Sequence, residues 1–250
     1  MDNATKRKLK KQDQFVALTN ESIHWAEQHR RKTIIAAVSL VVFVLAAVGG
    51  YTFYEHRTAQ AATAFGSAMQ VYQTPLLNPA QPVPPGTKTF NSVKERAAAA
   101  NTQFVQVAHQ YGLTKSGKLA EYFAGLTYME QGQNGPAEEA FRKTASSWDK
   151  GLAALGKSSL AQLDEQTGNN AAAIDLYNQL TKDAATTVPP ALAQLQLAEL
   201  YQSQGKTEDA RKIYAKLKDS DKDSTGKPGA ASQIATQKLN PKAAAGPSIQ

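Results

Sequence analysis

Residues 124–144 read AGLTYMEQGQNGPAEEAFRKT, and two later segments repeat this pattern when the three are aligned on a central glycine. Residues 160–180 read LAQLDEQTGNNAAAIDLYNQL, and residues 197–217 read LAELYQSQGKTEDARKIYAKL. The aligned glycines are 36 and 37 residues apart, at Gly132, Gly168 and Gly205. A fixed period of this length indicates a stack of similar units, each too small to bury its own apolar face.

Other positions keep the same register. Each glycine is followed after five residues by an alanine and after nine by an aromatic residue: Ala137 and Phe141, Ala173 and Tyr177, Ala210 and Tyr214. Small residues precede the glycines by seven positions, at Gly125, Ala161 and Ala198. A glycine can end a helix in a left-handed cap, and small residues let the next helix cross closely. The pattern predicts an all-α fold of helix–turn–helix pairs, from which only Asp164 departs, at a position where the other copies have tyrosine.

A fainter copy precedes these three, because Ala100, Phe104 and Val107 match the second-helix positions 37 residues before Ala137. Its first helix would lie in residues 55–73, displaced by a proline-rich loop. The expected order is a juxtamembrane helix and loop at 55–90, repeats at 91–225, a capping helix at 226–239 and a disordered tail at 240–250.

The apolar stretch Thr33–Tyr54, TIIAAVSLVVFVLAAVGGYTFY, carries no charge. As a helix it would extend roughly 33 Å, enough to cross a hydrocarbon core of about 30 Å. Eight basic residues lie in the leader 1–32, which places the N-terminus in the cytoplasm and the following domain outside. A cleaved signal peptide is the alternative, with Ala47 and Gly49 at a small-residue cleavage site, but the apolar core and the leader are both long for one.

Composition excludes several classes of site. The chain has no cysteine, so disulfides, thiolate metal ligands and cysteine nucleophiles are absent. The net charge of +7 is carried largely by the leader, and no basic run interleaved with aromatic residues follows the apolar stretch. Nucleic acid is therefore not an expected partner.

Residues 151–158, GLAALGKS, match the phosphate-loop pattern G-x-x-x-x-G-K-[ST]. Because no strand is predicted before them and Lys157 and Ser158 fall in a repeat helix, we interpret the match as a coincidence. A nucleotide-using enzyme is the remote alternative. The four histidines do not converge on metal-ligand spacing. No catalytic residue, cofactor or metal is expected.

The repeats resemble the tetratricopeptide repeat, in which the first helix of each pair lines a groove that binds other proteins. Carried onto this register, the resemblance assigns to the protein-binding groove Leu119, Tyr122, Leu126, Met129 and Glu130, then Ser158, Gln162, Glu165 and Gln166, then Leu192, Leu195, Glu199 and Gln202. The leucines among them could equally be buried against the preceding repeat. The lysine and asparagine pattern that clamps a C-terminal carboxylate in some such domains is missing.

The whole organisation, a basic leader, one uncleaved span and a helical repeat domain, resembles the YfgM-type ancillary subunit of the bacterial Sec translocon. This resemblance implies a single-pass protein of the bacterial inner membrane with a periplasmic domain. The implied partners are translocon subunits, periplasmic chaperones or exported chains, with the lipid bilayer around residues 33–54. A repeat scaffold in envelope assembly or cell division is the alternative.

Overall fold

The structure, a computed structural model, describes residues 30–78, 84, 86, 88–183, 187–223 and 225–240. The chain separates into two compact units, Met1–His56 and Arg57–Gln250. The predictions for most of the leader, for much of the proline-rich loop and for the tail after Asn240 lie outside the described residues.

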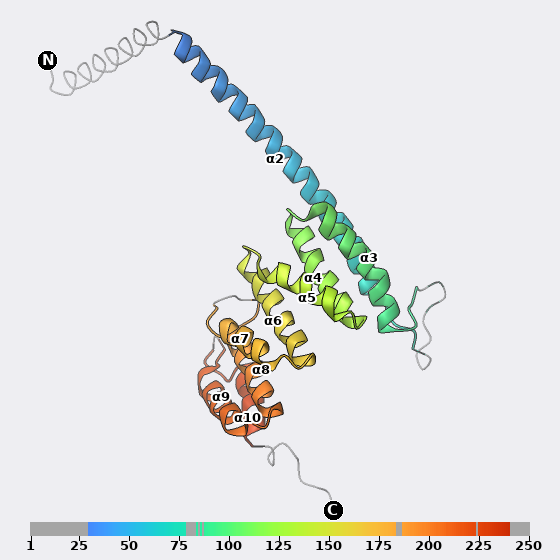
Figure 1. Cartoon of the computed structure of the whole chain (residues 1–250), viewed down its shortest axis with the longest axis vertical. Helices are drawn as coiled ribbons and strands as arrows, with labels where there is room; N and C mark the ends of the chain where they lie inside the picture. Colours follow the sequence, from blue (N-terminus) through green and yellow to red (C-terminus); the bar gives the residue numbers. More distant parts are fainter. Residues whose placement is uncertain are drawn as a thin grey trace, which may run out of the picture. The chain divides into compact units, whose positions relative to one another are not determined.

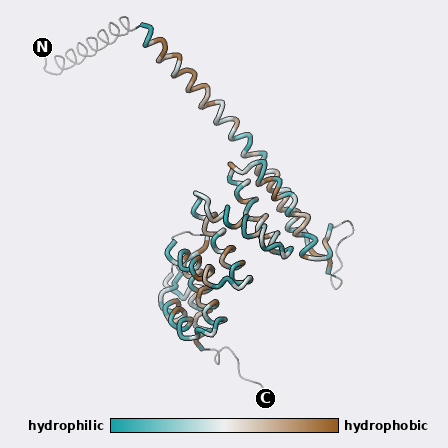
Figure 2. The backbone as a smooth tube through the Cα atoms, viewed as in Figure 1, coloured by the Kyte–Doolittle hydropathy of each residue, from teal (hydrophilic) through white to brown (hydrophobic). Residues whose placement is uncertain are grey.

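Helix α2, Arg30–Tyr72, contains the predicted membrane span. An 18-residue window within it has a mean hydropathy of 2.5 and no buried residue, so the helix is long and apolar enough to cross a membrane. Large apolar side chains such as Phe43 and Leu45 are 70% and 67% exposed. Figure 2 shows this apolar stretch along the first part of α2.

The described part of the second unit is all-α and consists of the end of α2 and eight more helices. These are α3 (Val93–Tyr111), α4 (Lys115–Glu130), α5 (Asn134–Ala145), α6 (Lys150–Gln166), α7 (Asn170–Leu180), α8 (Pro190–Ser203), α9 (Thr207–Ser220) and α10 (Ala230–Leu239). From α3 onward each helix packs on the next along the chain (Figure 1). The three predicted repeats are the pairs α4–α5, α6–α7 and α8–α9.

The three repeat glycines have left-handed backbone conformations, as predicted, with φ of +76°, +82° and +75° at Gly132, Gly168 and Gly205. In each turn the glycine N–H donates to the carbonyl three residues before it, and the next N–H reaches the carbonyl five residues before itself. These longer bonds run from Gln133 to Tyr128 (2.9 Å), from Asn169 to Asp164 (2.7 Å) and from Lys206 to Tyr201 (2.9 Å). They satisfy the carbonyls that the end of a helix leaves without partners.

The structure also confirms the predicted packing of the alanine and aromatic positions of the repeat. Ala137, Ala173 and Ala210 are buried, and so are the aromatic residues Phe141, Tyr177 and Tyr214. A Cβ atom built on Gly125 would lie 2.6 Å from the Phe141 ring, so the upstream small residue of the first repeat makes room for its own aromatic partner.

The degenerate pair forms as expected. Ala61 and Ala68, near the end of α2, share a buried cluster with Ala100 and Phe104 of α3. Four rings close this cluster, and the centroids of Phe104 and Phe123 are 5.3 Å apart in a stacked arrangement. Phe65 and Tyr72 pack on both of them.

Both ends of the proline-rich loop are fixed. The Leu77 N–H donates to the Phe90 carbonyl (2.8 Å), and the Phe90 N–H donates to the Pro75 carbonyl (3.1 Å). Phe90 itself is buried. The two ends of the segment that connects α2 and α3 thus lie side by side.

The predicted capping helix is α10. Ala231 and Ala235 pack in a buried cluster with Leu195, Tyr214 and Leu217 of α8 and α9. The Ser232 hydroxyl donates to the Lys218 carbonyl (2.8 Å), which fixes α10 across the end of α9. This helix covers the apolar face that the last repeat would otherwise expose.

Replacing Gly132 by Ala should lower the free energy of unfolding by about 1–2 kcal/mol, because an L side chain is strained at its positive φ. A Cβ atom there meets no other atom within 4 Å, so the cost is purely conformational. Gly135, in the first turn of α5, is the matched control. It also has open space around it and no positive φ, and alanine there should be neutral or stabilising. Urea denaturation of both variants tests this, and equal effects would contradict it.

Candidate functional site

The predicted groove residues of α4 are half-buried. Tyr122, Leu126 and Met129 are half-buried and pack against the cluster containing Phe141 of α5 and Leu160 of α6. Each of the three keeps part of its surface, so their assignment to a protein-binding groove stays a prediction.

Two further predicted residues are buried. Ser158 is 8% and Leu195 5% exposed, so neither presents surface to a partner. Leu195 packs against α9 and α10, and Ser158 lies in α6, which has α5 and α7 on either side. The other predicted residues outside α4 keep more surface: Gln162, Glu165, Gln166, Leu192, Glu199 and Gln202, as does Leu119 in α4.

Three of the predicted binding residues accept hydrogen bonds from tyrosines. The Tyr177 hydroxyl donates to Glu165 Oε2 (3.4 Å), and the Tyr214 hydroxyl donates to Gln202 Oε1 (3.1 Å). At the degenerate pair, the Tyr72 hydroxyl donates to Glu130 Oε1 (2.7 Å). These acceptors hold neighbouring helices together, which is a structural role that the sequence interpretation did not give them.

The repeat register contains the signal for these bonds. Each acceptor of the second and third repeats stands three residues before the glycine, and its tyrosine stands nine residues after it. In the first repeat the same two positions hold Met129 and Phe141, neither of which forms such a bond. Both partners thus change together along the chain, from an apolar pair to a hydrogen-bonded pair.

The one departure from the repeat, Asp164, also has a structural explanation. Its carboxylate is buried and accepts a hydrogen bond from the Asn169 side chain (3.0 Å), which ties the end of α6 to the following turn. Burial raises the pKa of Asp164, partly offset by this hydrogen bond. Asp164 thus fixes its turn by a polar contact, whereas the first and third repeats have Tyr128 and Tyr201 at the equivalent position.

Open space lies on another face of α4. Two adjoining hollows between α3, α4 and α5, of about 170 and 370 Å³, share Ala108, Glu121 and Lys143 as lining residues. The floor of this combined space is formed by Glu121, Ala124 and Tyr128, which are spaced by about one helical turn along α4. The exposed His109 lies on its α3 wall. We call this space the α3–α5 groove. It spans roughly three turns of α4, or about 16 Å.

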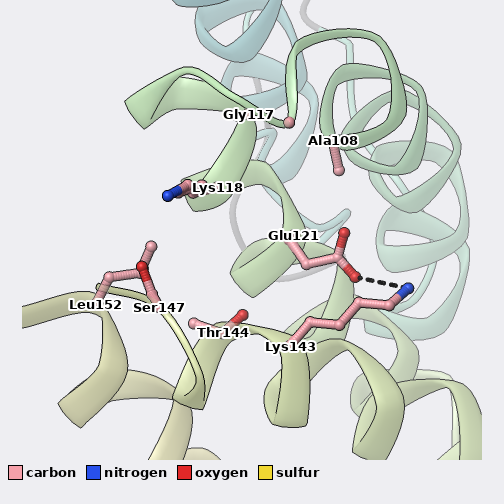
Figure 3. A pocket seen from close by; sticks show the side chains of 9 residues that line it. Ala108, Gly117, Lys118, Glu121, Lys143, Thr144, Ser147 and Leu152 are labelled. Carbon is pink, nitrogen blue, oxygen red and sulfur yellow. Dashed lines mark ion pairs between the residues drawn. The ribbon is translucent and has the colours of Figure 1, made fainter. Parts of the chain in front are cut away.

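Charged side chains cross the middle of the α3–α5 groove. Lys143 Nζ lies 3.6 Å from Glu121 Oε1 and 2.9 Å from Glu139 Oε1, and Figure 3 shows the first of these pairs. The hydrogen bond to Glu139 and the charge of Glu121 raise the pKa of Lys143. Because Lys143 and Glu139 are largely exposed, the ion pair between them is weak and can exchange with the charges of a partner.

The phosphate-loop match lies entirely within α6. Its second glycine, Gly156, is a packing residue, since a Cβ atom there would lie 2.4 Å from the backbone nitrogen of Ala145. Lys157 Nζ pairs with Asp183 Oδ2 (3.2 Å). The helical backbone bonds its own N–H groups, so the segment has no loop of free N–H groups to hold a phosphate. Among the residues described, no group of three or more His, Cys, Asp or Glu side chains could hold a metal ion.

The stacked helix pairs, their left-handed glycine turns and the terminal capping helix define an α-solenoid built for contact with other molecules. The chain belongs to the tetratricopeptide repeat-like domain family, whose sequence profile matches residues 24–244. Members of this class generally bind other proteins, so the domain is a protein-interaction scaffold. Comparison with curated proteins gives no match, and comparison with solved structures gives none either.

Replacing Tyr214 by Phe removes the hydroxyl that bonds Gln202 and should cost about 0.5–1.5 kcal/mol. Replacing Gln202 by Met should cost a similar amount, because the buried hydroxyl then loses its acceptor. The double variant recreates the Met129–Phe141 pair of the first repeat and should be more stable than the sum of the two losses predicts, by about 0.5 kcal/mol or more. Strictly additive losses in urea denaturation would contradict the pairing.

Stability should fall in alkali. Burial, reinforced by the nearby Glu199, raises the pKa of Tyr214 to about 12. Burial and the nearby Glu165 likewise raise the pKa of Tyr177. The unfolded chain loses these protons first, near pH 10, so stability is full below about pH 10 and is lost as the pH rises toward the folded values. Urea midpoints between about pH 9 and 11.5 measure this loss. The Tyr214→Phe variant should lose less stability over this pH range than the unsubstituted protein. An equal loss in both would contradict the assignment of this effect to Tyr214.

Proposed function

We propose that this protein is a single-pass scaffold of the bacterial inner membrane, with a cytoplasmic N-terminus and a periplasmic repeat domain that assists exported chains at the Sec translocon. The observation that carries the proposal is the exposure of the apolar part of α2. The other described helices expose few of their large apolar residues, whereas this segment exposes nearly all of its own. Exposed apolar area of this extent is stable in lipid and unstable in water.

The sequence supports the orientation. Basic residues are concentrated before the span, including Arg30, Arg31 and Lys32 directly before it. Such residues stay on the cytoplasmic side of a membrane. The repeat domain then lies outside the cytoplasm, where exported chains emerge.

The α3–α5 groove supports a role in holding other chains. It combines apolar walls, such as Val105 and Ala140, with the exchangeable ion pair of Glu139 and Lys143. An extended or helical segment of a few residues fits a groove of this length, and the mixture of apolar and charged side chains suits binding of varied sequences.

A photo-reactive amino acid at His109 tests the proposal in cells. His109 is exposed on the wall of the groove. We expect crosslinks from this position to translocon subunits or to newly exported chains. The matched control places the same group at Lys216, an exposed residue of α9 away from the groove.

A second position, Gln202, reports on the face that the family resemblance assigned to binding. Crosslinks from Gln202 and not from His109 would move the binding site to that face and leave the scaffold function intact. Absence of translocon subunits and exported chains at both positions would contradict the proposed function.

A further inference from the structure

One edge of the repeat domain carries the two most exposed large apolar residues of its described part. Leu113, between α3 and α4, is 88% exposed, and Trp148, between α5 and α6, is 82% exposed. Both lie in loops that join one repeat to the next. The two loops face one another, because Gly112 and Ser147 line the same hollow.

The same edge is basic. Lys115 and Lys118 begin α4, and Lys150 begins α6. None of the three forms an ion pair with a residue that the structure describes. Lys118 instead places its ammonium group 4.6 Å from the centre of the Trp148 ring. The carboxylates nearby are engaged elsewhere, since Glu121 pairs with Lys143 and Asp149 caps α6 by accepting from the Leu152 N–H.

The chain enters the domain beside this edge. Arg57, the first residue of the unit, donates a hydrogen bond to the Gln110 carbonyl and lies over the Tyr111 ring, at 5.3 Å from its centre. Leu113 follows Tyr111 by two residues. The apolar stretch ends at Tyr54, three residues before Arg57 in sequence.

We infer that this edge, formed by Leu113, Lys115, Lys118, Trp148 and Lys150, docks on the surface of an anionic lipid bilayer. The inference rests on the proposed membrane anchor. Tryptophan prefers the headgroup level of a bilayer, an exposed leucine can enter the acyl boundary, and lysines are attracted to anionic lipids. Because the anchor is attached within a few residues, the bilayer is present at a high effective concentration, and weak contacts suffice. This favours lipid over an acidic protein segment.

The fluorescence of Trp148 tests the docking in the full-length chain. The protein contains only one other tryptophan, Trp25, which is replaced by Phe. The chain is reconstituted into vesicles of phosphatidylcholine alone or with phosphatidylglycerol, each containing lipids brominated near the headgroup. Bromine quenches tryptophan on contact. We expect the emission to fall by roughly half or more in the anionic vesicles and little in the neutral ones.

Two triple variants separate charge at this edge from charge in general. Lys115→Gln, Lys118→Gln and Lys150→Gln together should abolish the additional quenching in anionic vesicles. The control variant makes the same change in net charge away from this edge, with Lys94→Gln in the first turn of α3, Lys206→Gln just before α9 and Lys212→Gln within α9, and should leave the quenching intact. Leu113→Ser should weaken it without loss of thermal stability, because this side chain is nearly fully exposed.

Extraction with alkaline carbonate distinguishes failure of the docking from failure of the anchor. Retention of the chain in the membrane together with unquenched Trp148 would overturn the docking and leave the anchor and the scaffold in place. It would also leave the edge as a surface for an acidic protein segment. Release of the chain by carbonate would overturn the anchor and the docking together.

Discussion

The repeat domain depends on a single backbone constraint, a glycine in the left-handed conformation at the centre of each helix pair. Two hydrogen bonds fix each of these turns, and the same turn recurs at Gly132, Gly168 and Gly205. A fixed turn sets the angle at which the second helix returns. The alanine five residues later then meets the first helix at close range, and the aromatic ring fills the remaining space. The period of the sequence is a direct consequence of this local geometry.

Features that depend on local geometry were predictable from the sequence, and features that depend on distant neighbours were not. The glycine turns, the alanine crossings and the buried aromatic residues follow from spacing within one pair. The surroundings of α4 also include α6, a helix from the next repeat. Tyr122 and Met129 pack against a cluster that includes Leu160 of α6, a contact that spacing within one pair does not reveal. The hollow lined by Glu121 and Tyr128 lies a fraction of a turn away around the same helix.

A segment can also match a sequence motif without having the physical role of that motif. The glycine and lysine of GLAALGKS match a phosphate loop in the sequence, yet Gly156 serves the close approach of α6 to the end of α5, and Lys157 pairs with Asp183. In contrast, the change from Met129 and Phe141 to Glu165 and Tyr177 matches no motif and reports a real contact. Such contacts can be found by comparing the repeats with one another, because both partners change at fixed positions of the repeat.

The bridge between Leu76 and Phe90 has a consequence for how this fold can evolve. Because the two ends of the segment that connects α2 and α3 meet, residues gained or lost between them alter neither the position where α2 ends nor the position where α3 begins. Closing a flexible loop of twice the length costs only about 0.6 kcal/mol more. Sequence between these residues is therefore free to drift in length and composition, and an appendage acquired there would leave the register of the helix pairs unchanged.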